Sequence, residues 1–360
     1  MGKDIQKSNT RSAYLDILRL LCSYLVVLGH TAAQEWGNIP VTSGEWHVVN
    51  AFDCFPMSGV LLFFMISGTL FLNENYNLSI KKLYVKKILH IVIIYHVWLL
   101  IYNIIPFLQG DIAWSFVNIK EKIVFDTLEG VGIYHLWFLE DLIPLYLITP
   151  IIKEAFRKKE MCEYFLGLYI IMGIVMTTVL LFDFPGKYLV EGYYNRTTWV
   201  MLTGYIGYYV AGHYIHSFVT KEPTKKQKVL LAITAILSYV AVISICSIDA
   251  LKKNEPSVIM NTPFGIPHFI APICIFVLAK FGFDKLDVSK HSWIKLMSKA
   301  SLGIYLIHPI VINIFNGIGI STIEPHPLIM IPVFSILVYS ISALLVFVML
   351  KIPGVKKLVL

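Results

Sequence analysis

The stretch YLDILRLLCSYLVVLGHTAA, residues 14–33, indicates the class of the fold. A helix that crosses the hydrocarbon core of a bilayer needs about 20 predominantly apolar residues. This stretch has that length, and its only ionisable side chains apart from tyrosine and cysteine are Asp16, Arg19 and His30. No small-residue cleavage site follows it, so we expect it to stay in the protein as a membrane-spanning helix.

Further apolar stretches follow along the whole chain, with short polar gaps between them. Hydrophobic residues make up 57% of the 360 residues and charged residues 15%, whereas about a quarter of a soluble protein is charged. We therefore predict an all-α fold, with one membrane domain over residues 1–360 built as a polytopic bundle of about ten transmembrane helices. The expected helices are 14–33, 57–73, 83–105, 133–152, 163–183, 197–218, 229–248, 264–281, 296–318 and 326–350.

The distribution of Lys and Arg predicts the orientation of these helices. Alternate connecting segments hold 23 of the 30 Lys and Arg residues, and Arg19 lies within the first helix. The other six are Lys120, Lys122, Lys187, Arg196, Lys252 and Lys253. Cytoplasmic loops are enriched in basic residues, so both termini are predicted to lie inside, and the net charge of +7 calls for no nucleic-acid partner. The high usage of Ile and Lys is typical of an AT-rich bacterial genome, so we expect a multi-pass protein of the bacterial cytoplasmic membrane.

The longest segment expected outside, 106–132, mixes aromatic and aliphatic residues with charged ones. This pattern predicts an amphipathic helix that lies on the outer interface or caps a cavity. The five cysteines are scattered and do not have the spacing of a disulfide framework. No HxxxH or HxH spacing supports a metal site, and none is predicted.

Ionisable side chains inside the membrane cost about 2.5–3.5 kcal/mol each and are candidates for function. Asp16 and Arg19 are three residues apart, so they share a helix face and can form a structural ion pair. His30 follows Asp16 by 14 residues, which is about 21 Å along a helix and places it near the outer end.

Other imidazoles and carboxylates are expected near that outer end. They are His135, His268 and His308, together with Glu35, Glu45 and Asp53 of the first outer loop. A gathering of such groups favours general-base chemistry that faces outward. A set of histidines that only pack and form hydrogen bonds is the alternative.

Four short motifs occur in order along the chain. They are Tyr14-Leu-Asp16-Ile-Leu-Arg19 with Val26-Val-Leu-Gly-His30, Phe63-Phe-Met-Ile-Ser67-Gly68, His135-Leu-Trp137-Phe-Leu with Leu145-Tyr146 and Pro150, and Ser301-Leu-Gly-Ile-Tyr305-Leu-Ile-His308-Pro309. In this order they resemble the acyltransferase-3 family of integral membrane O-acyltransferases. The resemblance covers residues 14 to 309, which is most of the chain.

This resemblance implies an enzyme that uses cytoplasmic acyl-CoA, usually acetyl-CoA, as a donor substrate and holds no bound cofactor. The acyl group would pass to a hydroxyl of an extracytoplasmic acceptor, such as a cell-surface glycan or a small molecule. The catalytic histidine of the family matches His30. The basic pair of the family at the inner end of the third helix falls on Lys87 and His90, a departure from its two arginines, and Lys86 and Arg19 would add charge for the CoA phosphates.

The remaining predicted roles concern the surroundings of His30. Glu35, or else Glu45 or Asp53, would orient the imidazole, and His135 is the second candidate for the base. Ser67, Trp137, Tyr305 and His308 would line a pore for the acyl-CoA arm, although each is also suited to helix packing. A permease for a small solute or lipid-linked sugar, and a membrane sensor or scaffold, are the alternatives to an enzyme. The acceptor and the oligomeric state stay open.

Overall fold

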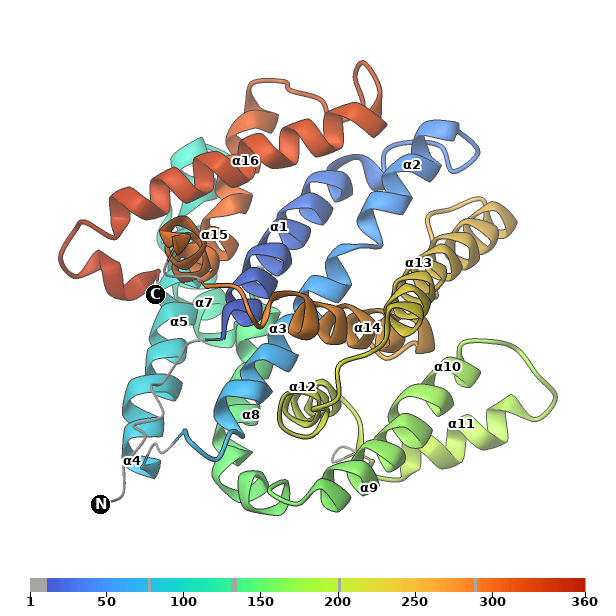
Figure 1. The fold of residues 1–360 in the computed structure, drawn as a ribbon. Helices are drawn as coiled ribbons and strands as arrows, with labels where there is room; N and C mark the ends of the chain where they lie inside the picture. The colour runs from blue at the N-terminus through green and yellow to red at the C-terminus, as the bar shows by residue number, and fades with distance from the viewer. Residues whose placement is uncertain (1–11, 77–78, 131–134, 200–201, 288–289, 360) are drawn as a thin grey trace, which may run out of the picture.

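The computed structural model describes residues 12–76, 79–130, 135–199, 202–287 and 290–359 (Figure 1). Within these ranges the chain is helical and has no β-strand. The helices are α1 (Ala13–Trp36), α2 (Gly44–Asp53), α3 (Pro56–Phe71), α4 (Ile80–Leu83), α5 (Leu89–Gln109), α6 (Phe116–Asn118), α7 (Asp126–Glu129), α8 (Trp137–Ala155), α9 (Lys159–Tyr169), α10 (Met176–Leu180), α11 (Lys187–Arg196), α12 (Ile206–Phe218), α13 (Lys225–Lys253), α14 (Ile266–Phe283), α15 (Ser292–Gly317) and α16 (Pro327–Met349). The wider π-helical stretches Tyr84–Ile88, Ile119–Phe125 and Ile170–Val175 join α4 to α5, α6 to α7 and α9 to α10.

In the part of the chain that the structure describes, eight helical stretches are long and apolar enough to cross a membrane. They overlap eight of the ten predicted helices, and the other two predicted helices correspond to α8 and α12. α8 carries Glu140, Asp141, Lys153 and Glu154, and α12 has only 13 residues. The all-helical membrane fold is therefore confirmed, and the count of ten crossings stays a prediction.

The centre of the bundle is formed by α1 and α3, with α15 and α16 on one side and α9 to α11 at the opposite edge (Figure 1). The closest packing is between α3 and α12. A side chain on Gly68 would overlap the backbone of Tyr209, and one on Gly212 would overlap the backbone of Met65. Small residues at helix crossings allow such an approach, which gains van der Waals contact where no hydrophobic effect drives association.

Polar contacts tie several helix ends together at one end of the bundle. The Ser298 hydroxyl at the start of α15 donates to the Asp16 carboxylate near the start of α1, over 2.7 Å. Lys280, near the end of α14, donates to the carbonyls of Ile215, His216 and Val219 at the end of α12. The Tyr14 hydroxyl in α1 lies 2.6 Å from the Nδ1 atom of His216 in α12. The starts of α1 and α15 therefore lie beside the ends of α12 and α14.

The structure differs from the predicted helices at three places. α2 and α11 were not expected, and both lie in segments predicted as outer connections. The helix expected over 197–218 begins only at Ile206, because Gly204 adopts a φ of +76° that interrupts a right-handed helix. The predicted amphipathic segment is confirmed as helical over 116–129, and it exposes Phe116 and Leu128.

The predicted orientation can be tested by cysteine labelling. The five native cysteines are all buried, so a membrane-impermeant maleimide should report only on an introduced cysteine. We expect Lys120→Cys to be labelled from outside intact cells and Lys225→Cys to be labelled only after permeabilisation, because both side chains are exposed and lie in segments of opposite predicted side. Labelling of position 225 but not 120 from outside would reverse the orientation.

Candidate active site

Three histidines from three separate segments come together in the core. His30 lies in the last third of α1, His308 lies beyond the middle of α15, and His135 comes two residues before α8. The Nδ1 atom of His30 is 2.6 Å from the Nε2 atom of His308, and their rings are stacked with centroids 4.9 Å apart. The His135 ring centroid is 6.3 Å from that of His30 and 5.7 Å from that of His308.

Two tyrosines hold the helices around these rings. The Tyr305 hydroxyl donates to the carbonyl of His135, and the Tyr102 hydroxyl donates to the carbonyl of Leu306 over 2.7 Å. Both tyrosine rings also pack edge-on against the His135 ring. These contacts connect α5, α8 and α15 at the cluster and fix the relative positions of the imidazoles.

The cluster has one partly exposed member. His135 and His308 are 1% and 0% exposed, whereas His30 is only partly buried. Of the three histidines, His30 is therefore the one most exposed at the surface of the protein. Tyr305 and His308, which were predicted to line a pore, are both buried in this cluster.

The structure places the other expected outer groups differently. The Glu35 carboxylate accepts a hydrogen bond from Asn38 over 3.3 Å, and Glu45 is exposed. His268 belongs to a separate chain of contacts, in which Asn261 links its Nε2 atom to the Asp53 carboxylate. The expected gathering thus includes His30, His135 and His308, whereas His268 and Asp53 belong to a separate chain of hydrogen bonds and Glu35 binds Asn38.

The residues predicted to bind the donor lie toward the other end of α1. Arg19 pairs with Asp16 over 3.0 Å, which confirms the predicted ion pair. Lys86 and Lys87 are exposed in the π-helical stretch before α5. Lys87 interacts electrostatically with Arg19 and with His90, so these basic side chains and Lys86 gather into one basic region at this end.

Side chains between these two ends are partly exposed although they lie on central helices. Ser67 and Phe63 are one turn apart on α3, and Trp137 begins α8. The Ser67 hydroxyl interacts with the Tyr146 hydroxyl, and Tyr146 also interacts electrostatically with Arg19. The Phe63 ring packs against Phe138, and Phe138 packs against Tyr305, which contacts the His135 ring. Polar and aromatic side chains therefore connect the basic region with the histidine cluster.

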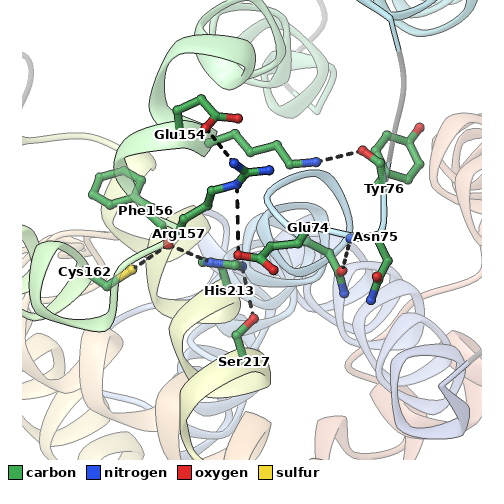
Figure 2. A network of polar contacts seen from close by, with 11 residues as sticks. Glu74, Asn75, Tyr76, Glu154, Phe156, Arg157, Cys162, His213 and Ser217 are labelled. Carbon is green, nitrogen blue, oxygen red and sulfur yellow. Dashed lines mark hydrogen bonds and ion pairs between the residues drawn. The ribbon is translucent and has the colours of Figure 1, made fainter.

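A polar cavity of about 310 Å³ lies near the end of α12 and contains none of the predicted site residues. Figure 2 shows that Arg157 reaches toward both Glu74 and Glu154, and that His213 contacts the carbonyl of Phe156 and the hydroxyl of Ser217. The charge of Arg157 is thus already balanced within the protein. Among the described residues, no group of three or more His, Cys, Asp or Glu side chains could hold a metal ion.

Comparison with known protein families gives a match over nearly the whole chain. A family model described as an acyltransferase domain matches residues 12–351. No curated protein and no solved structure matches the chain. The matched range contains the histidine cluster and the basic region at the other end of α1.

Proposed function

The chain belongs to the acyltransferase-domain family, and on that premise we propose that it moves an acyl group, usually acetyl, from cytoplasmic acyl-CoA to a hydroxyl of an extracytoplasmic acceptor. A cell-surface glycan is the acceptor that fits best with the outward position proposed for His30. The protein would act in the bacterial cytoplasmic membrane with both termini inside.

In the proposed reaction His30 is the general base. Its Nε2 atom takes the proton of the acceptor hydroxyl while the oxygen attacks the thioester carbonyl. The carbon–sulfur bond then breaks, the acyl group stays on the acceptor oxygen as an ester, and the CoA thiolate takes the proton back from His30. Acceptor and thioester would meet beside the partly exposed ring of His30, with His135 as the alternative base.

The observation that carries this proposal is the separation of two kinds of group along α1. Basic residues that suit the CoA phosphates lie near Arg19, and the imidazoles lie about 11 residues further along, at His30, His135 and His308. This span corresponds to roughly 16 Å of helix. An extended pantetheine arm is long enough to reach from the one to the other.

The proposal can be tested with purified protein in liposomes. We expect acetyl-CoA to be consumed and free CoA to appear only when an acceptor is present, and mass spectrometry of surface glycans should show acetyl esters that are lost when the protein is absent. A permease would move a solute without consuming acetyl-CoA. If no acyl donor is consumed with any surface glycan fraction, the proposed activity is wrong.

The donor site gives a separate prediction. Lys87→Ala should weaken acyl-CoA binding about tenfold or more, because one lost charge-assisted contact to a phosphate is worth about 1.5–3 kcal/mol. The fold should be unaffected, since the Lys87 side chain is exposed. Calorimetric titration with CoA measures the change, and Lys226→Ala, an exposed charge at the start of α13, is the matched control. Equal CoA affinity in Lys87→Ala and wild type would place the donor elsewhere.

A further inference from the structure

The contact between His30 and His308 has a direction that can be derived from the backbone of α15. The Nδ1 atom of His308 lies 3.1 Å from the carbonyl oxygen of Ile304. The carbonyl of Tyr305 is a second acceptor for this ring, and Pro309 supplies no N–H to the carbonyl four residues before it, which is that of Tyr305. A carbonyl oxygen can only accept, so the Nδ1 atom of His308 carries a hydrogen.

The position of this hydrogen determines the rest of the pair. A neutral imidazole has one N–H donor and one acceptor nitrogen, so the Nε2 atom of His308 is an acceptor. The nitrogen that lies 2.6 Å from it, Nδ1 of His30, must therefore be the donor. The lone pair of neutral His30 is then on Nε2, the nitrogen that the proposed reaction requires.

We infer that His308 is a positioning residue that fixes the tautomer and the ring orientation of His30. This inference rests on the proposed function. His308 holds the place that a carboxylate has in many histidine-dependent sites, where a partner of the imidazole selects its tautomer. Of the carboxylates in the first outer loop, Glu35 accepts a hydrogen bond from Asn38 and Asp53 accepts one from Asn261.

A neutral partner suits this location for an electrostatic reason. His308 is 0% exposed, and an ionised carboxylate there would require desolvation of a full charge. An imidazole accepts the same hydrogen bond without a resting charge. When His30 takes up a proton from the acceptor hydroxyl, its Nδ1–H becomes a stronger donor, so the bond to His308 tightens as the transition state forms.

Two substitutions of His308 separate a positioning role from a packing role. His308→Leu replaces the imidazole with an apolar side chain of similar size and so removes the acceptor. We expect kcat to fall about 10–100-fold, the usual cost of losing a partner that orients a histidine. KM for both substrates should not change, because His308 touches neither. His308→Gln offers an amide oxygen near the position of Nε2 and should restore most of kcat.

The matched control is His268→Leu, which removes an equally buried histidine from the other hydrogen-bond chain. It should leave kcat unchanged, and thermal unfolding should be followed for all three variants. If His308→Leu is folded and keeps wild-type kcat, or if His308→Gln is as slow as His308→Leu while both are folded, the positioning role is wrong. An inactive wild type would instead refute the proposed function.

Discussion

His30→Ala is expected to lower the rate of acyl transfer about 10²–10⁴-fold, the usual cost of losing a general base. The acceptor hydroxyl would then have to lose its proton to water. Binding of acyl-CoA should be unchanged, because the basic residues that would hold the donor lie toward the start of α1. The expected defect is thus in kcat and not in the affinity for CoA.

The measurement is acetyl transfer by purified variants, with CoA titration as the test of integrity. His135→Ala is the informative comparison, because its ring centroid lies only 6.3 Å from that of His30. The His135 side chain is 1% exposed, whereas His30 is the more accessible ring, so we expect the larger loss from His30→Ala. If His30→Ala keeps most of its activity and His135→Ala does not, the base is His135. If both variants keep full activity, the proposed mechanism is wrong.

The features that were predicted correctly from sequence depend on residues near one another in the chain. Asp16 and Arg19 share a helix face by their spacing alone, and their pairing is observed. The membrane-spanning helices were also predicted correctly, because each is marked by a run of apolar residues. One local signal was overlooked: Thr224 and Gln227 form a capping box that starts α13 at Lys225, four residues before the predicted start.

The sequence could not predict which residues of different helices contact one another. His268 and His308 are both histidines in apolar segments expected at the outer end, yet only His308 reaches His30. Tyr102 ends the apolar stretch between His96 and Asn103 of α5, and no local pattern distinguishes it from a packing residue. Its role depends on the carbonyl of Leu306, which is 204 positions away. Such contacts follow from tertiary packing, which periodicity does not encode.

Gly68→Ala is expected to prevent stable folding, which is the second large effect. A Cβ atom at this position would overlap the carbonyl group and the Cα atom of Tyr209 in α12, and Gly212→Ala would meet the backbone of Met65 in the same way. Because the opposing atoms belong to the backbone, no side-chain rotation can relieve the overlap, and α3 and α12 would have to move apart. Overpacking a core typically costs about 1–3 kcal/mol even when side chains can adjust.

The displacement would also break contacts that depend on the α3–α12 distance. Tyr209 shares a hydrogen bond of 2.8 Å with Thr149 of α8, and Tyr205, just before α12, stacks on Phe64 of α3. We therefore expect little monodisperse Gly68→Ala protein after purification in detergent and a lower midpoint of thermal unfolding for any that is recovered. Gly167→Ala is the matched control, because this exposed glycine of α9 has no atom within 4 Å of an added Cβ. Should Gly68→Ala purify and unfold like Gly167→Ala, the close approach of α3 and α12 would not be a feature of the folded protein.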